Sequence, residues 1–305
     1  MRVVVNDKNI EFKWANVQMS LGTIARSFTL TVTDSSSPIM MDDSVQISTD
    51  SGRLLIDAVV EYVSCDADQL YTYAGRNRSR LIVDSYAEKT VQYSEIQDIV
   101  TVLNASKKFG IEINGNASLP KDERRTILAG SNLGAEFASI AHASRAVIHS
   151  DARGNIKIEG NSFYDDQPFT LGDNIRSRTF VFNQTLQHDR YVVKCQSNLL
   201  LNDSLEPDIS GEFGSGERTK VIISDSNLNK QECDTLAAHF YHLDRRNSLQ
   251  YVIEIDTAID VDLNHLYSVK DAPLGIFQFM RSNEIVVSSG IEQDKTLLTL
   301  GNIND

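Results

Sequence analysis

A regular alternation of apolar and polar residues runs through the first ninety residues, and it restricts the fold more than any other feature of the sequence. In the segment 28–33, Phe28, Leu30 and Val32 fall on one face and three threonines fall on the other. A strand with one buried face requires this period of two. Similar runs, separated by turn-forming clusters, occupy residues 1–6, 44–48, 54–63 and 70–74. Several short strands at this spacing predict a small β-barrel or sandwich.

The periodicity becomes helical after residue 90. Ser94 and Gln97 are spaced as a capping box, and apolar residues follow them at helical intervals. A second helix is expected over residues 133–145, and it leads into two short strands joined by a tight turn at 151–154. The sequence therefore predicts an α/β domain over residues 91–162.

Strand patterns return beyond residue 162, and one helix interrupts them. They occupy residues 179–182, 190–196, 219–223, 250–256, 284–287 and 296–300. Asn229 and Glu232 have the spacing of a helix cap, and a polar stretch at 200–218 predicts an exposed loop. The expected class is α+β and mostly β, with three parts: a β domain at 1–90, the α/β domain at 91–162 and a second β-rich domain at 163–305.

Composition excludes several classes of protein. The chain of 305 residues has 42 acidic and 29 basic side chains and a net charge of −13, which argues against duplex DNA as a tightly held partner. The sequence contains no apolar run of the roughly 18–20 residues that a membrane helix needs. Residues 1–14 also lack the apolar core of a signal peptide, so we expect a soluble protein made in a cytoplasm.

The cysteines and histidines do not predict a metal centre. Cys65, Cys195 and Cys233 are widely spaced and form no C-x-x-C pair, so neither a disulfide framework nor a zinc ribbon is indicated. His239 and His242 stand three apart on the predicted helix, whereas a zinc-protease helix needs a spacing of four, an intervening glutamate and a third ligand. Two partly exposed helix histidines are the better interpretation.

Catalytic and phosphate-binding motifs are equally weak. Asp165, Asp166, Asp84 and Glu136 could supply the carboxylates of a hydrolase, but solvated surface explains most acids in so acidic a chain. The glycine-rich segment 211–216 follows no convincing strand and carries no lysine at the required place, so a flexible connector is predicted there. We expect no catalytic residue, cofactor or metal.

The most concentrated positive charge lies in the segment 75–80. Arg76, Arg78 and Arg80 alternate there and would share one face if the chain were extended. Guanidinium groups bind carboxylates and phosphates through paired hydrogen bonds, so the segment is a candidate contact site. A solvated loop after a strand is the alternative, and the residues alone leave both open.

This arginine segment also carries a family resemblance. Residues 73–87, which include Gly75-Arg76-Asn77-Arg78 and Val83-Asp84, resemble a characteristic segment of Mu-like phage baseplate hub proteins. Other pieces follow in the order of that family: the capped helix from Ser94, the helix and hairpin at 133–159, and the strand at 189–196. The family's strand usually ends in Gly-Gln, whereas Cys195 precedes Gln196 here.

The resemblance implies a structural, non-enzymatic component of a contractile or related tail, located in the virion baseplate and assembled in the bacterial cytoplasm. Such hubs are homotrimers whose subunits each contain two similar β-barrel domains with an α/β insertion. Three such pairs form a pseudo-sixfold ring that joins the tail tube to the central spike. The alternatives are a tail-associated cell-wall hydrolase and a small-barrel binding module.

The implied partners are the trimeric tail spike protein, the tail tube or tube-initiator protein and the tape-measure protein. DNA would only pass through the lumen, and the chain alone would bind no membrane. Within this hypothesis Arg76, Arg78 and Arg80 are candidate interface residues that pair with acids of a neighbouring subunit or partner.

Overall fold

The computed structural model describes residues 1–33, 39–66, 70–93, 110–115, 125–143, 146–160, 163–170, 173–195, 209–224, 228–255, 261–290 and 294–302. The chain forms two compact units. The first unit consists of Met1–Arg178 and Val252–Leu300, and the second of Thr179–Tyr251 and Gly301–Asp305. The chain passes between them within three strands: β14 (Ser177–Phe182), β18 (Leu249–Ile255) and β21 (Lys295–Asn302).

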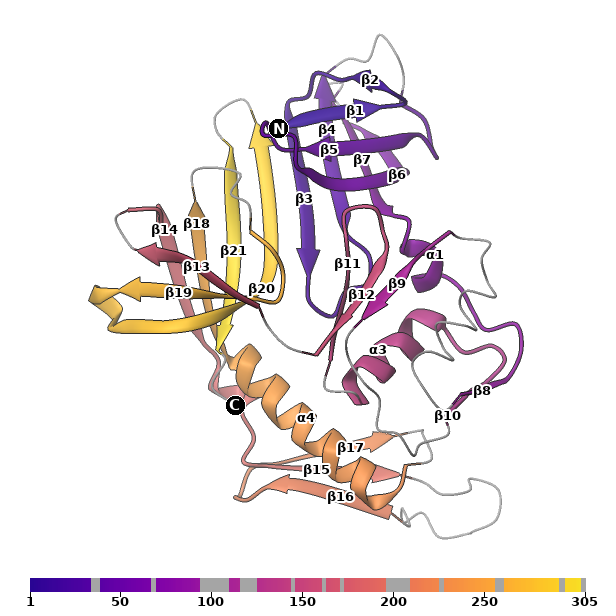
Figure 1. The fold of residues 1–305 in the computed structure, drawn as a ribbon, viewed down its shortest axis with the longest axis vertical. Helices are drawn as coiled ribbons and strands as arrows, with labels where there is room; N and C mark the ends of the chain where they lie inside the picture. The colour runs from indigo at the N-terminus through magenta and orange to yellow at the C-terminus, as the bar shows by residue number, and fades with distance from the viewer. Residues whose placement is uncertain are drawn as a thin grey trace. The chain divides into compact units, whose positions relative to one another are not determined.

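Strands dominate the first unit (Figure 1). Its N-terminal strands are β1 (Arg2–Val5), β2 (Lys8–Asn9), β3 (Trp14–Ser20), β4 (Ser27–Thr33), β5 (Ser44–Ser48), β6 (Leu54–Cys65) and β7 (Leu70–Asn77). Its later strands, besides β18 and β21, are β13 (Phe163–Thr170), β19 (His265–Asp271) and β20 (Ile276–Gly290). The 3-10 turn η3 (Ala272–Leu274) joins β19 to β20.

Strands β3 and β20 join these two groups into one sheet. They run antiparallel, with Val17 opposite Val287. The order continues through β4, β7, β6, β5, β1 and β2 on one side and through β21 and β18 on the other, while β19 pairs with β20 and β13 with β19. The alternation predicted for β4 is confirmed, since Phe28, Leu30 and Val32 are buried. The pairings of the described strands form an open path, and closure of either group into a barrel stays a prediction.

The α/β part of the first unit follows β7. Its elements are α1 (Arg80–Val83), β8 (Val91–Tyr93), β9 (Ile113–Gly115), β10 (Arg125–Ile127), α3 (Leu133–Ala143), β11 (Val147–Ser150) and β12 (Ile156–Glu159). Strands β11 and β12 form the predicted hairpin, and β9 adds to β12 in parallel. The predicted helix over 133–145 is confirmed as α3, whereas the helix that begins at Ser94 lies outside the described residues.

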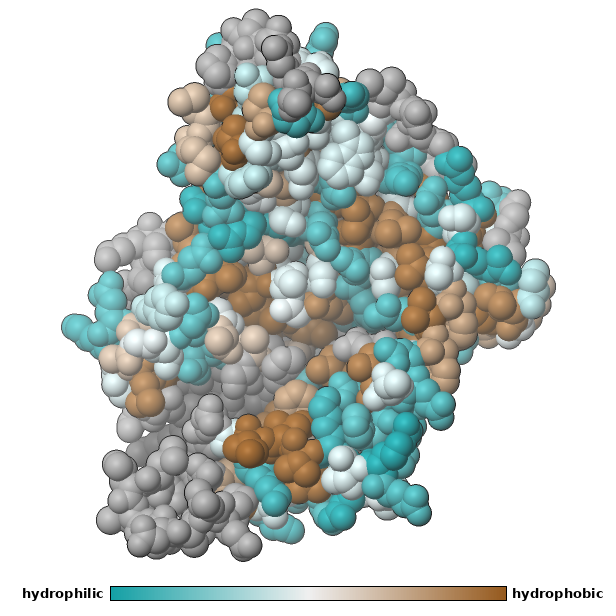
Figure 2. Space-filling view, turned by 180° about the vertical axis from the view of Figure 1, so that it is seen from behind, coloured by the Kyte–Doolittle hydropathy of each residue, from teal (hydrophilic) through white to brown (hydrophobic). Residues whose placement is uncertain are grey.

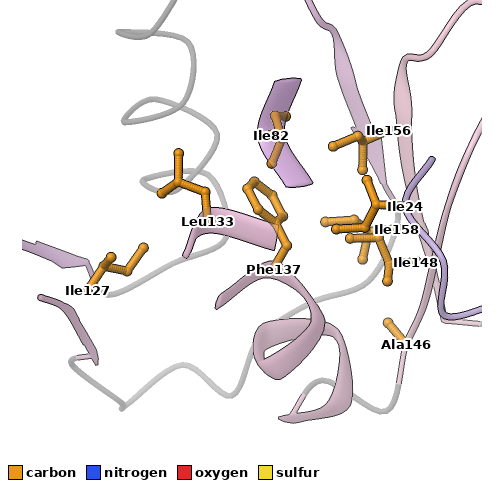
Figure 3. Close-up of a cluster of buried hydrophobic side chains, with 9 residues drawn as sticks. All are labelled: Ile24, Ile82, Ile127, Leu133, Phe137, Ala146, Ile148, Ile156 and Ile158. Carbon is orange, nitrogen blue, oxygen red and sulfur yellow. The ribbon is translucent and has the colours of Figure 1, made fainter. Parts of the chain in front are cut away.

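A separate hydrophobic cluster holds this α/β part together (Figure 3). Phe137 of α3 lies at its centre, with Ile82 of α1 beside it and the isoleucines of β11 and β12 facing it. The members share near-complete burial; they are Ile24, Ile82, Ile127, Leu133, Phe137, Ala146, Ile148, Ile156 and Ile158. Burying a side chain of this size contributes about 1.5–3 kcal/mol, so the cluster fixes α1, α3 and the hairpin relative to each other.

The second unit packs one long helix on a three-stranded sheet. Its elements are the 3-10 turn η2 (Gln184–Leu186), β15 (Arg190–Cys195), β16 (Ile209–Gly214), β17 (Thr219–Ser224) and α4 (Lys230–Ser248). Strand β15 is central, antiparallel to β16 and parallel to β17. The predicted cap of α4 is confirmed: the side chain of Asn229 accepts a hydrogen bond from the Glu232 amide, and Glu232 accepts one from the Asn229 amide.

The prediction of a loop over 200–218 is wrong for residues 209–214, which form β16. The glycines that suggested a flexible connector instead permit close packing. A β-carbon on Gly211 would lie 2.2 Å from the Asp234 amide nitrogen, and one on Gly214 would lie 2.3 Å from the Asp189 carbonyl oxygen. Only a residue without a side chain allows α4 and the chain before β15 to approach β16 this closely.

The class of the fold is α+β and mostly β, as predicted. The division into domains at residues 90 and 162 stays a prediction. Within the described residues no helix is both long enough and apolar enough to cross a bilayer.

Candidate interface segment

The arginine segment begins at the close approach of β7 to β6. A β-carbon on Gly75 would lie 1.8 Å from the carbonyl oxygen of Val59, so no other residue fits without backbone movement. The β6–β7 register shifts between Val60 and Tyr62, which marks a β-bulge at this point. The bulge and the glycine together set where β7 ends and therefore where the arginines project.

Arg76 and Arg80 lie on carboxylates of the same chain. Arg76 donates to both oxygens of Glu61 (Nε–Oε2 2.8 Å, Nη2–Oε1 2.9 Å) and to both oxygens of Asp84 (Nη1–Oδ1 3.1 Å, Nη2–Oδ2 2.7 Å). Nη1 of Arg80 also donates to Glu61, at 3.1 Å. The hydrogen bond to Glu61 is the largest cause that raises the pKa of Arg76, which stays charged at every physiological pH. The positive charges of these two arginines and the negative charges of the two acids therefore neutralise each other within the subunit.

Arg78 differs from its two neighbours. It is exposed, and its Nη1 donates to the carbonyl oxygen of Gly110 at 3.2 Å. Among the residues that the structure describes, no carboxylate lies within ion-pair distance of Arg78. The extended chain that would place all three arginines on one face does not continue through this segment, because β7 ends at Asn77 and helical geometry begins at Arg80.

The two polar residues between the arginines anchor the segment. Asn77 and Ser79 are fully buried. Asn77 Nδ2 donates to Ser150 Oγ (2.9 Å) and to the carbonyl oxygen of Asp151 (3.1 Å), and the hydroxyl of Ser79 lies 2.6 Å from Asn77 Oδ1. These contacts form a joint between the end of β7 and the end of the β11–β12 hairpin. The sequence did not indicate either residue, because polar residues within a charged run are typical of a solvated loop.

The turn of that hairpin packs directly on the arginine segment. A β-carbon on Gly154, where φ is +82°, would lie 2.7 Å from the amide nitrogen of Arg78 and 2.8 Å from that of Ser79. The glycine is therefore required both for the left-handed backbone and for the approach. A second cation supports the joint: Arg26 donates to the carbonyl oxygens of Ser150 and Leu55, both at 2.9 Å. Desolvation by burial lowers its pKa to about 10.

A small polar cleft of about 220 Å³ lies beside this joint. It is lined by Arg26, His149, Lys157, Glu159, Asp262, Leu263 and His265. His149 Nε2 lies 3.1 Å from Glu159 Oε2, which also accepts a hydrogen bond from Asn264 (3.2 Å). Burial raises the pKa of Glu159, but its bonds to His149 and Asn264 outweigh burial and lower the pKa overall. An ionised, paired carboxylate is not poised as a general acid, which needs a raised pKa.

The other candidates are not brought together. His239 and His242 lie on α4, and no group of three possible metal ligands occurs in the described part of the chain. Asp84 pairs with Arg76, and Glu136 lies in the first turn of α3. The side chains of Asp165 and Asp166 lie outside the described residues.

Exposed apolar side chains lie on strands of both units. In the first unit Phe277 (67% exposed) and Phe279 (42%) lie on one face of β20, beside Leu274 of η3. In the second unit α4 packs on one face of the sheet, and Val221 (53%) and Ile223 (69%) are exposed on β17. Figure 2 shows apolar side chains gathered over this sheet. Each face has the composition of a protein contact surface.

Sequence comparison identifies no relative: no protein-family model and no curated protein matches the chain. Comparison with solved structures does identify the fold. The chain is similar to the 43 kDa tail protein of prophage MuSo2 from Shewanella oneidensis, with a TM-score of 0.84, 16% identity, and 98% and 97% of the two chains covered. It is also similar to a tail protein from Neisseria meningitidis, with a TM-score of 0.80, 14% identity, and 99% and 96% covered.

A third structure widens the comparison. The chain is similar to a component of the Escherichia coli type VI secretion system, a protein described as resembling the T4 phage tail proteins gp27 and gp5. The TM-score is 0.57 at 12% identity, and 98% of this chain and 76% of the other are covered. The resemblance to Mu-like phage tail proteins is thus confirmed at the level of the fold.

Proposed function

We propose that this chain is the baseplate hub protein of a phage-like tail, a structural component without enzymatic activity. One observation carries the proposal: the fold matches that of a prophage tail protein from end to end, with 98% of this chain and 97% of the other covered at a TM-score of 0.84. A match over nearly the whole of both chains supports a shared structural role more than an added catalytic domain.

In the proposed hub, three copies form a ring of six β-rich halves that joins the sixfold tail tube or its initiator to the trimeric spike. The tape-measure protein and DNA would pass through the lumen, for which a net charge of −13 is suited because it repels polyanions. The exposed apolar residues of β17 and β20 support the assembly, because stable rings bury such surfaces between subunits.

The three candidate interface residues contribute unequally to this proposal. Arg76 and Arg80 hold Glu61 and Asp84 in place, so their first role is within the subunit. Arg78 is exposed and is the one of the three with no carboxylate partner among the described residues. We therefore assign the contact with an acid of a neighbouring subunit or of the spike to Arg78.

Solution mass tests the ring. Light scattering over a range of protein and salt concentrations should give a mass near three times 34.0 kDa, alone or after addition of the spike protein of the same tail. Electron microscopy of that species should show a ring. A chain that stays monomeric in both conditions would contradict the proposed hub.

Charge reversal tests Arg78. Arg78→Glu should weaken the trimer or its complex with the spike, and higher salt should reduce the difference between variant and wild type. Arg2→Glu is the matched control, because Arg2 is also exposed in the first unit and, among the described residues, its side chain bonds the side chain of Asn9 alone. Equal assembly by the two variants would remove Arg78 from the interface and leave the ring itself untouched.

A further inference from the structure

Two buried cysteine thiols face each other in the second unit. Cys195 ends β15 and is 1% exposed, and Cys233 lies in the first turn of α4 and is fully buried. Their sulfur atoms are 3.1 Å apart. The two residues are 38 positions apart along the chain and belong to different layers of the unit.

The packing that creates this pair is specific. A β-carbon on Gly211 of β16 would lie 2.4 Å from the carbonyl carbon of Cys233 and 2.6 Å from its β-carbon. The helix therefore rests directly on the backbone of the sheet at this point. The capping box of Asn229 and Glu232 fixes where the helix begins, and with it the position of Cys233 in the first turn.

We propose that Cys195 and Cys233 form a site of oxidative modification, at which a thiol oxidant produces one intramolecular disulfide that joins α4 to β15. A disulfide bond is about 2.05 Å long, so each sulfur needs to move by only about 0.5 Å from the observed separation of 3.1 Å. In the reaction each thiol loses its proton, the two sulfurs form one bond, and two electrons pass to the oxidant. With diamide, a diazenedicarboxamide, as the oxidant, the N=N group takes up both electrons and both protons and becomes a hydrazine.

The environment keeps the pair reduced until a suitable oxidant arrives. Burial, followed by the hydrogen bond with Cys195, raises the pKa of Cys233 to about 12. The thiolate is the attacking form in disulfide exchange, and neither sulfur is open to a bulky reagent. The raised pKa slows reaction with both kinds of oxidant, so the difference between them rests on size and charge: we expect slower reaction with glutathione disulfide than with a smaller, neutral oxidant. The exposed Cys65 should be accessible to both reagents.

This inference concerns the second unit alone and does not depend on the proposed function. The two are nevertheless compatible, because a tail protein is assembled in a reducing cytoplasm and then meets an oxidising exterior, where disulfides persist. The crosslink would close a loop of about 40 residues and should raise the melting temperature of the second unit by on the order of 10 °C.

The experiment uses the full chain with Cys65→Ser, which removes the exposed thiol and leaves the pair. The variant is treated with diamide under native conditions and then alkylated in guanidinium chloride. We expect a monomer-sized chain, lighter by two hydrogen atoms, that takes up no alkylating reagent and gives a crosslinked peptide containing Cys195 and Cys233. Reduction should reverse the change.

Two controls keep the result decisive. Cys65→Ser combined with Cys195→Ala should take up one alkyl group and show no shift of melting temperature after diamide. The Cys65→Ser chain treated with diamide in guanidinium chloride should crosslink, which shows that the oxidant is active. If the native Cys65→Ser chain still takes up two alkyl groups while this denatured control crosslinks, the proposal is overturned.

Discussion

Replacement of Asn77 tests whether the arginine segment is a structural joint. Asn77 is fully buried and makes three side-chain hydrogen bonds: to Ser150, to the carbonyl of Asp151 and from Ser79. A buried hydrogen bond contributes about 0.5–1.5 kcal/mol net, so the loss of three such bonds costs about 1.5–4.5 kcal/mol. The Asp151 carbonyl also accepts a hydrogen bond from the Gly154 amide (3.2 Å), so it keeps one partner after the substitution, and the two serine hydroxyls can rotate to other partners. Asn77→Ala should therefore lower the free energy of unfolding of the first unit by about 2–4 kcal/mol.

The chain offers a selective probe for this measurement. Its only tryptophan is Trp14 of β3, so tryptophan fluorescence during denaturant unfolding reports on the first unit. Arg78→Ala is the matched control, because the adjacent exposed residue should change the unfolding free energy by no more than about 0.5 kcal/mol. If Asn77→Ala costs less than about 1 kcal/mol, or no more than Arg78→Ala, then the joint does not depend on the buried amide and the reasoning fails.

Three further perturbations have defined outcomes. Gly75→Ala places a β-carbon against the Val59 carbonyl, so it should lower the free energy of unfolding of the first unit by more than about 3 kcal/mol or prevent its folding. The same tryptophan fluorescence measures this, and unfolding close to that of wild type would contradict the close approach. Gly211→Ala should lift α4 from β16 and slow native diamide crosslinking at least several-fold, whereas an unchanged rate would show that the glycine does not set the thiol separation. The pKa of Glu159 is lowered in the folded state, so its contribution to the free energy of unfolding is present above the unfolded pKa of about 4.3 and is lost as pH falls through the lower folded pKa. Glu159→Gln should therefore make stability depend less on pH in that range. Equal midpoints of acid denaturation for variant and wild type would refute the assignment.

Much of the fold could be predicted because it depends on local sequence patterns. The alternation in β4, the cap at Asn229 and the hairpin at 147–159 depend on residues close together in sequence. The pairing of β3 with β20 and the strand β16 could not be predicted. The first joins residues more than 260 positions apart, and the second has glycines whose role appears only when α4 lies over them.

The sequence indicated a candidate contact segment but not its detailed geometry. The sequence indicated the segment 75–80, yet only the structure distinguishes Arg76, which binds four carboxylate oxygens within the subunit, from the exposed Arg78. The buried pair of Asn77 and Ser79 gave no periodic signal, since two polar residues in a charged run look like solvated loop. The separation of Cys195 from Cys233 hid their contact for the same reason as in β3 and β20: distance along the chain says nothing of distance in space.

The pairing of β3 with β20 also sets the order of events during synthesis. Ser20 pairs with Glu284, so 264 residues must be added after the edge of β3 is made before its partner exists. At about 5–20 residues per second, that edge waits for roughly 13–50 s. Until then a nascent chain presents unpaired backbone groups and half of an apolar face, which are the features that promote association with other strands. Chains released early, before β20, would keep this edge permanently. Synthesis of β20 is therefore the step that commits the first unit to its native sheet.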